Sequence, residues 1–314
     1  TCALPILMFG QRMAAITGDA SYYDYVEKAL YNTVIAGINI AGDRYFYVNP
    51  LEVVPEFCTE HTYMEHVKPV RQKWFGVACC PPNVGRTLAS LGQYIYAEDE
   101  YGVYINQFIS STADTEVRES RLKIKMNSTL LQDGKVQIEV QSSGPGNLNI
   151  RIPWYSEKCE CVQNGISIEI QPEKGYQRLS ISPGDTYISL DFHVSPRWMG
   201  ANNGVRADAG KAALMKGPLV YCLEEKENGR YLSEIFIEEN TSIEETAPAE
   251  ELVGNVPTLS YKGIRVRNKG AAGENQLYGN VELEKEEVSL QAVPYCMWNN
   301  RGEGEMLVWH KLRV

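Results

Sequence analysis

The sequence lacks an excess of positive charge. Its 314 residues carry 30 lysines and arginines against 40 aspartates and glutamates, which gives a formal net charge of −10. A nucleic acid or an anionic membrane surface is bound through a basic face. We therefore expect neither of these partners, whereas an uncharged small ligand is compatible with the charge balance.

Long hydrophobic runs are also missing. No uninterrupted apolar stretch reaches the roughly 20 residues that cross a bilayer. The opening Thr-Cys-Ala-Leu-Pro has neither the basic flank nor the small-residue cleavage site of a secretory signal. The sequence does not start with methionine, so we expect it to begin inside a longer protein.

Cysteine is too sparse for a disulfide scaffold, because eight residues are scattered over the chain without regular spacing. This favours a reducing compartment, and we expect the cytoplasm. Two of the cysteines, Cys79 and Cys80, are neighbours. Adjacent Cα atoms lie about 3.8 Å apart, less than the roughly 4.4–6.8 Å of an ordinary disulfide. The pair therefore indicates two thiols, which suit zinc binding or nucleophilic attack, or else two small buried residues at the end of a loop.

The hydrophobic period divides the chain into a helical start and a β-rich remainder. Apolar residues recur at steps of three and four over residues 1–17, 19–36 and 84–96, and Asn83 is the expected cap of the third helix. Residues 44–50 alternate like a short strand. From residue 98 onward the period is two, with Asp133-Gly134 and Asn164-Gly165 among the turn signals, which is typical of antiparallel sandwiches. A Gly- and Asn-rich stretch at residues 200–204 marks a second boundary.

Several stretches of the chain are similar to glycoside hydrolase family 127, the β-L-arabinofuranosidases. The most specific is Cys-Cys-Pro-Pro-Asn at residues 79–83; the others are at residues 1–3, 29–33, 45–52, 148–154, 216–221 and 294–306. The chain resembles the C-terminal half of that family. The resemblance implies a mixed, multidomain fold, with the last helices of an (α/α)6 barrel in residues 1–97 and two antiparallel β-sandwich domains in residues 98–200 and 201–314.

The resemblance also implies a zinc site and a cysteine nucleophile. Cys2, Cys79 and Cys80 match three zinc ligands, and Cys79 matches the nucleophile of a retaining glycosidase acting on plant glycans. The fourth ligand and the acid/base, both glutamates, precede Thr1 in the family pattern, so the chain alone is expected to be a poor catalyst. Glu27 and Tyr47 match segments of the sugar pocket, although a solvated helix carboxylate and a core aromatic remain alternatives for them. The implied substrate is a small carbohydrate, and a homodimer is compatible with the sequence.

Three other interpretations remain open. Cys58 and His61, with Cys79 and Cys80, have residue types that suit a structural zinc site. A free amine on Thr1 is the base of N-terminal nucleophile hydrolases, but the order of helices followed by strands disfavours that fold. The β regions can also form a non-catalytic carbohydrate-binding module that presents tryptophans for stacking, the candidates being Trp154, Trp198, Trp298 and Trp309.

Overall fold

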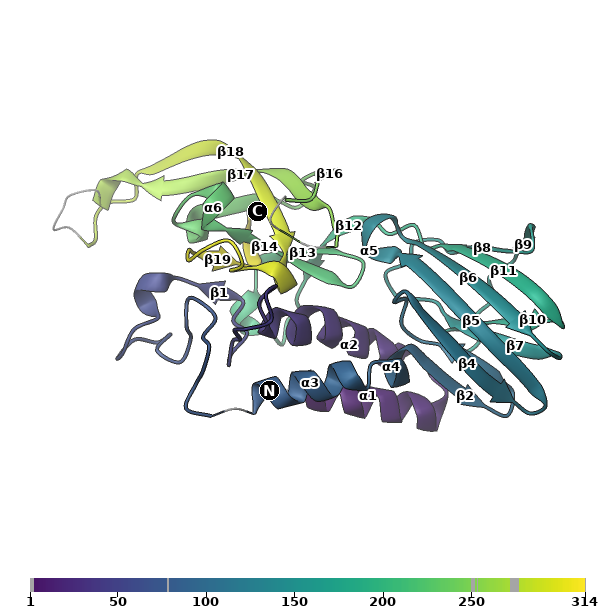
Figure 1. The fold of residues 1–314 in the computed structure, drawn as a ribbon. Helices are drawn as coiled ribbons and strands as arrows, with labels where there is room; N and C mark the ends of the chain where they lie inside the picture. The colour runs from purple at the N-terminus through teal and green to yellow at the C-terminus, as the bar shows by residue number, and fades with distance from the viewer. Residues whose placement is uncertain (1–2, 78, 250–251, 253, 272–276, 314) are drawn as a thin grey trace. The chain divides into compact units, whose positions relative to one another are not determined.

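The computed structural model describes residues 3–77, 79–249, 252, 254–271 and 277–313 (Figure 1). Short helices come first and strands follow, so the predicted order of N-terminal helices and β-rich domains is confirmed. The chain divides into two compact units. Unit 1 consists of Thr1–Val34 and Val77–Ser195, and unit 2 of Ile35–Gly76 and Pro196–Val314. The boundaries expected near residues 97 and 200 stay a prediction. No helix in the described ranges is long and apolar enough to cross a bilayer.

Unit 1 begins with two helices in close contact, α1 (Ala3–Thr17) and α2 (Ser21–Ala29). Gly10 makes this contact possible, because a Cβ there would lie only 2.7 Å from Cγ2 of Val26. Asp19 accepts a hydrogen bond from the backbone N–H of Ser21 at the start of α2. The second helix was expected to run regularly to residue 36, but after Ala29 it changes into a π-helical turn, Leu30–Val34. Helices α3 (Cys80–Ala89) and α4 (Gly92–Ile95) follow later in the unit.

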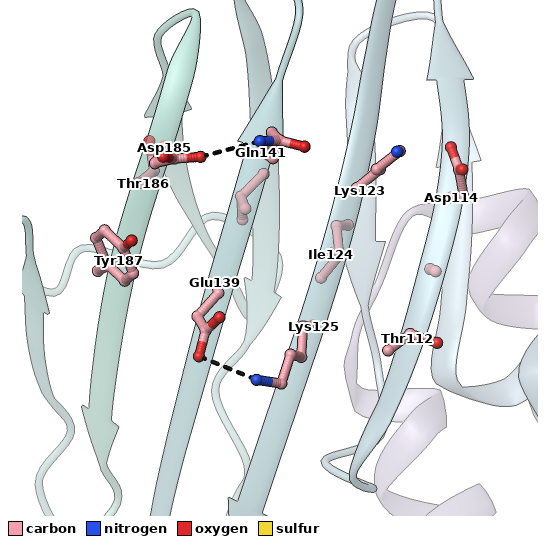
Figure 2. Close-up of a pocket in the computed structure, with 12 residues that line it drawn as sticks. Thr112, Asp114, Lys123, Ile124, Lys125, Glu139, Gln141, Asp185, Thr186 and Tyr187 are labelled. Atoms are coloured by element: carbon pink, nitrogen blue, oxygen red, sulfur yellow. Dashed lines mark hydrogen bonds and ion pairs between the residues drawn. The ribbon is translucent and has the colours of Figure 1, made fainter.

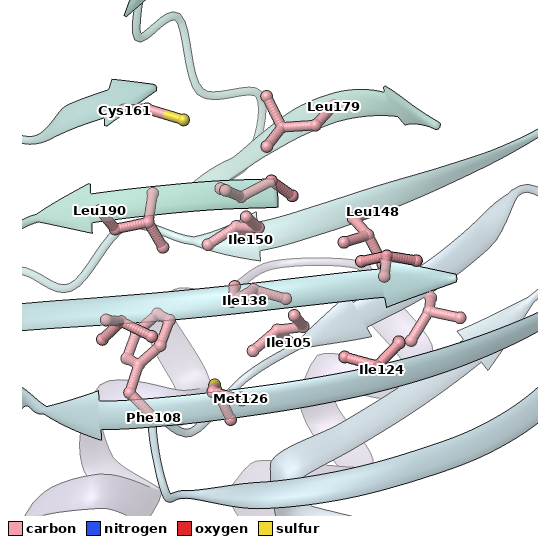
Figure 3. Close-up of a cluster of buried hydrophobic side chains, with 14 of the residues drawn as sticks. Ile105, Phe108, Ile124, Met126, Ile138, Leu148, Ile150, Cys161, Leu179 and Leu190 are labelled. Atoms are coloured by element: carbon pink, nitrogen blue, oxygen red, sulfur yellow. The ribbon is translucent and has the colours of Figure 1, made fainter. Parts of the chain in front are cut away.

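Two sheets of unit 1 pack face to face over one hydrophobic core. The four-stranded sheet has the order β10 (Tyr176–Ile181), β7 (Gly146–Arg151), β3 (Gly102–Ile105), β2 (Tyr96–Asp99). The six-stranded sheet has the order β4 (Ser111–Val117), β5 (Ser120–Thr129), β6 (Lys135–Ser142), β11 (Gly184–Asp191), β8 (Glu160–Gln163), β9 (Ile166–Ile168). A short helix, α5 (Leu130–Asp133), lies between β5 and β6 in the chain. Figure 3 shows side chains from both sheets in this core. Strand β5 alternates strictly between buried and exposed residues as far as Asn127, which leaves a polar outer face on the six-stranded sheet. One pair, β3 and β7, is parallel.

Unit 2 contains a ten-stranded sheet instead of two separate layers. Its strands are β1 (Glu52–Val53), β12 (Pro196–Gly200), β13 (Lys211–Lys216), β14 (Leu219–Glu224), β15 (Ile235–Glu238), β16 (Ile243–Thr246), β17 (Thr258–Asn268), β18 (Leu283–Pro294), β19 (Met306–Leu307) and β20 (Trp309–Arg313). Because β13 also pairs with β14, the path β14-β18-β17-β15-β20-β13 closes on itself. This differs from the second antiparallel sandwich that was expected, and β15 pairs with β20 in parallel.

Residues 35–76 contact the loop that follows β18 in unit 2 through Arg71. Its guanidinium donates hydrogen bonds to the carbonyl oxygens of Ala36 (2.8 Å) and Trp298 (2.7 Å) and lies 4.5 Å from the ring of Phe46. Phe46 in turn stacks on Trp298 at 4.7 Å between ring centroids. The strand expected over residues 44–50 is absent from this described segment, since Tyr45 makes only isolated bridges there.

His310 in β20 is fully buried in unit 2. Its Nε2 lies 2.6 Å from the hydroxyl of Tyr261, and its Nδ1 lies 3.0 Å from the carbonyl oxygen of Val308. A neutral ring with hydrogen on Nδ1 satisfies both contacts. Burial lowers the pKa of His310 from 6.5 to about 4.

We expect unit 2 to lose stability as pH falls, because the unfolded chain binds a proton at the position of His310 below pH 6.5 and the folded chain binds it only near pH 4. The stability that comes from keeping His310 neutral is fully present above pH 6.5 and is lost as the pH falls toward 4. Between pH 7 and pH 5 it amounts to about 2 kcal/mol of unfolding free energy. Urea unfolding of wild type and His310→Gln at both pH values measures it: the variant should show the smaller pH dependence. Equal pH dependence of the two proteins contradicts the assignment, and His193→Gln, at an exposed site, is the control.

Candidate functional site

The vicinal thiols lie at the N-terminal end of helix α3. Cys79 is the N-cap residue, and Cys80 is the first residue of the helix. Their Sγ atoms are 3.9 Å apart, so no disulfide joins them. The Cys79 side chain is exposed and that of Cys80 is half-buried. The alternative of two buried packing residues is therefore wrong.

The local sequence fixes where this helix starts. Pro81 and Pro82 occupy its first turn, where a backbone N–H has no intrahelical partner and proline is tolerated. Asn83 was predicted as the cap, but it lies inside the helix, and its Nδ2 donates to the carbonyl oxygen of Cys79 (2.7 Å). Arg86 donates to Oδ1 of Asn83 (2.7 Å) and so orients that amide. The backbone of Cys79 is thus held by side chains one turn further along the helix.

The surroundings of the two sulfurs stabilise one thiolate better than two. The N-terminal end of a helix carries partial positive charge, which stabilises a thiolate beside it. Burial, and after it the neighbouring thiol of Cys79, raise the pKa of Cys80. Two adjacent thiolates repel each other, so a bound cation is the natural means of stabilising both.

The other predicted zinc ligands are not assembled in the part of the chain that the structure describes. Cys2 lies outside the described residues. Within those residues, no group of three or more His, Cys, Asp or Glu side chains is arranged to hold a metal ion. Cys58 and His61 belong to unit 2; the Cys58 thiol is buried and lies 3.5 Å from the carbonyl oxygen of Val54, and the His61 side chain is exposed.

Glu27 is a buried carboxylate in an ion-pair cluster. It is fully inaccessible to solvent, its Oε1 lies 2.7 Å from Nη2 of Arg151, and the hydroxyl of Tyr155 donates to the same oxygen (3.1 Å). Nη1 of Arg151 contacts Asp24 at 2.6 Å. Burial raises the pKa of Glu27, and the charge of Arg151 opposes that shift. The interpretation as a solvated helix carboxylate is wrong, whereas a role in the sugar pocket stays a prediction.

The aromatic candidates occupy several kinds of environment. Tyr47 is half-buried in unit 2, with its ring centroid 5.8 Å from that of Phe75, and its role in sugar binding stays a prediction. Trp298 belongs to the core. Trp154 is half-buried, and the ammonium group of Lys28 lies 4.2 Å from its ring.

Sequence reasoning missed Arg151, which organises the buried cluster of unit 1. The available signal was a single arginine at the end of the alternating strand β7, Gly-Asn-Leu-Asn-Ile-Arg, followed by Ile-Pro-Trp. A charged residue buried in a strand needs a partner of opposite charge. Helix α2 supplies two acidic candidates, Asp24 and Glu27, spaced three residues apart on one face.

Comparison with known families gives three consecutive matches along the chain. Residues 1–93 match the "Beta-L-arabinofuranosidase, GH127 catalytic domain", residues 102–192 match the "GH127 middle domain" of the same enzymes, and residues 196–311 match the "Glycoside hydrolase family 127 C-terminal domain". The order of the three matches is the order expected from the sequence.

Individual relatives agree with these matches. A non-reducing end beta-L-arabinofuranosidase of Bifidobacterium longum subsp. longum is 34% identical over 99% of this chain and 48% of its own length. The crystal structure of a GH127 beta-L-arabinofuranosidase from Geobacillus stearothermophilus T6 has a TM-score of 0.91 at 36% identity, over 99% of this chain and 49% of that one. A second solved GH127 beta-arabinofuranosidase has a TM-score of 0.87 at 26% identity, over 99% and 49% of the two chains. The chain thus spans about half the length of the relatives it matches.

We expect Arg151→Met to destabilise unit 1 by about 3–5 kcal/mol, because the substitution leaves Glu27 and Asp24 without their buried cation. The measurement is urea unfolding at neutral pH. The matched control is Arg121→Met, which removes the exposed ion pair to Asp114 (2.7 Å) and should hardly change the midpoint. Equal losses in the two variants would contradict a central role for Arg151.

Proposed function

Because the chain belongs to glycoside hydrolase family 127, we propose that the protein is a retaining β-L-arabinofuranosidase-type glycosidase whose nucleophile is Cys79. The observation that carries this proposal is the exposed thiol of Cys79, which stands beside the half-buried thiol of Cys80 at the N-terminal end of α3 without a disulfide between them. A thiolate is a strong nucleophile at neutral pH, and exposure leaves it accessible to a sugar. The activities of the relatives named above support L-arabinofuranose in β linkage as the sugar, and we propose plant-derived glycans as its source.

The donor set is compatible with a zinc ion. Two sulfur ligands of one tetrahedral zinc, each about 2.3 Å from the metal, are about 3.8 Å apart. The Sγ atoms of Cys79 and Cys80 are 3.9 Å apart. We propose that these two residues, together with Cys2, hold the ion. When bound, zinc would lower the proton affinity of the thiols and offset the repulsion between neighbouring thiolates.

The proposed reaction is a double displacement with sulfur in the place of the usual carboxylate. The Cys79 thiolate attacks the anomeric carbon, a C–S bond forms and the C–O bond to the leaving group breaks, while a carboxylic acid protonates the departing oxygen. Water then attacks the same carbon, its proton passes to the carboxylate, and the C–S bond breaks to restore the thiolate. Helix α3 holds Cys79 through the contact of Asn83 to its carbonyl. Glu27 and Tyr47 are proposed as sugar contacts.

The first helices are proposed to complete a larger catalytic domain. Residues 1–93 match a GH127 catalytic domain, and we propose that α1 to α4 are the last helices of its (α/α)6 barrel. The acid/base glutamate would come from elsewhere in that barrel. We therefore propose that the 314-residue chain is a poor catalyst by itself.

We expect Cys79→Ala to lower kcat at least about a thousandfold in a polypeptide that contains the whole catalytic domain, since it removes the nucleophile. Release of the chromophore from an aryl β-L-arabinofuranoside measures the rate. Cys159→Ala, at a half-buried thiol beside β8, should stay near wild type. A Cys79→Ala variant that keeps most of its activity would exclude this nucleophile. A 314-residue chain as fast as the longer polypeptide would contradict the proposed dependence on the rest of the barrel.

Zinc content distinguishes the proposed site from the structural alternative. Elemental analysis of the purified polypeptide should find zinc in wild type and a loss of at least half of it in Cys80→Ser, because one sulfur ligand is removed. Cys58→Ser and His61→Ala should retain zinc. Because Cys80 belongs to both candidate sites, the Cys58 and His61 variants discriminate: loss of metal from these two variants would place the zinc in the structural site and remove this part of the proposal.

A further inference from the structure

The outer face of the six-stranded sheet in unit 1 contains an open hollow of about 660 Å³ (Figure 2). It extends over β4, β5, β6 and β11, on the side of the sheet opposite the hydrophobic core. We call it the outer-face hollow. Ligand sites are commonly concave surfaces of a few hundred Å³ with a small number of well-placed polar groups. No residue of this hollow belongs to the thiol site described above.

Strand register arranges the lining side chains in two rows across the sheet. One row is Thr112, Lys125, Glu139 and Tyr187, and the other is Asp114, Lys123, Gln141 and Asp185. Each residue pairs with the next one in its row on the neighbouring strand. Because alternate residues of a strand point to the same face, both rows project outward together. The result is a ladder of polar groups about four strands wide.

The chemistry of these rows suits an uncharged, hydroxyl-rich ligand. Positive and negative side chains alternate, so neither a polyanion nor a polycation meets a surface of uniform opposite charge. The contacts within the rows are long, at 3.4 Å for Lys125 to Glu139 and 3.4 Å for Gln141 to Asp185. The two oxygens of Asp114 also accept hydrogen bonds from Arg121 (2.8 and 2.7 Å). Ammonium, amide and carboxylate groups each make several hydrogen bonds, so the lysines, Glu139, Gln141 and Asp185 keep donors and acceptors for hydroxyl groups.

Tyr187 adds an aromatic platform to the polar rows. Its side chain is 59% exposed although it lies in a central strand of the sheet. An aromatic ring contacts the apolar C–H face of a sugar, and the phenol oxygen stays available for hydrogen bonding. A protein partner would instead require an apolar centre with several buried anchors, and the outer-face hollow offers one such ring.

We propose that the outer-face hollow binds a neutral oligosaccharide, with Tyr187 stacking on one sugar ring and the two rows hydrogen-bonding to its neighbours. The choice of a glycan that bears arabinofuranosyl units rests on the proposed function. In this arrangement the middle domain holds a long glycan independently of the thiols. The surface would then favour polymeric substrates over small ones without affecting the cleavage step.

Binding of a neutral arabino-oligosaccharide to the 314-residue chain tests the proposal by isothermal titration calorimetry. Wild type and Cys79→Ser should bind with the same Kd, and Tyr187→Ala should raise that Kd about tenfold or more. The matched control is Tyr101→Ala, which removes a tyrosine of similar exposure (53%) at the β2–β3 turn of the same unit. It should bind like wild type, and thermal unfolding of both alanine variants checks that they are folded.

Three outcomes would overturn the proposal: no binding by wild type, equal binding by wild type and Tyr187→Ala, or preferential binding of an anionic oligogalacturonate. Glycan binding that depends on Tyr187, in a protein without arabinofuranosidase activity, would support the surface and reject the proposed function. In an active longer polypeptide, Tyr187→Ala should raise KM for the oligosaccharide and leave hydrolysis of the small aryl glycoside unchanged. An equal effect on both substrates would contradict a separate binding surface.

Discussion

Unit 1 depends on the buried positive charge of Arg151. A guanidinium with no exposure to solvent is unfavourable unless acceptors surround it, and two different parts of the chain provide them. Helix α2 contributes Asp24 and Glu27, and the carbonyl oxygen of Asn106 accepts from Nε at 2.7 Å. The helices that match a catalytic domain and the sandwich that matches a middle domain therefore share one electrostatic centre.

The thiol site and the outer-face hollow lie on different kinds of secondary structure, and their backbones are held in place by different contacts. The thiols lie at the start of α3, where two prolines and the Asn83 side chain restrict the backbone. The hollow lies on hydrogen-bonded strands above a tightly packed core, and its side chains are spaced by strand register. One site consists of two neighbouring thiols, and the other of polar side chains that repeat at the spacing of the strands.

The sequence predicts those parts of the fold that local periodicity determines. The helix at residues 1–17 and the alternating strands of the sandwich follow directly from the apolar spacing. The start of α3 was misplaced because Asn83 is a good cap in isolation, while the two prolines also fit a first turn. The Arg151 cluster and the closure of the unit 2 sheet depend on residues far apart in sequence, and local patterns carry no information on such pairings. At the site, the thiol pair was recognisable from its motif, whereas the face with Tyr187 became visible only with the strand register.

Unit 2 is discontinuous, because residues 35–76 belong with residues 196–314. Arg71 and its hydrogen-bond partner Trp298 are 227 residues apart in the sequence. At ordinary translation speeds of roughly 5–20 residues per second, residues 35–76 are synthesised on the order of tens of seconds before the C-terminal residues that they pack against. During that interval Phe46 and its aromatic neighbours lack their final cover. During synthesis the apolar surface of this segment therefore stays exposed until the last strands emerge.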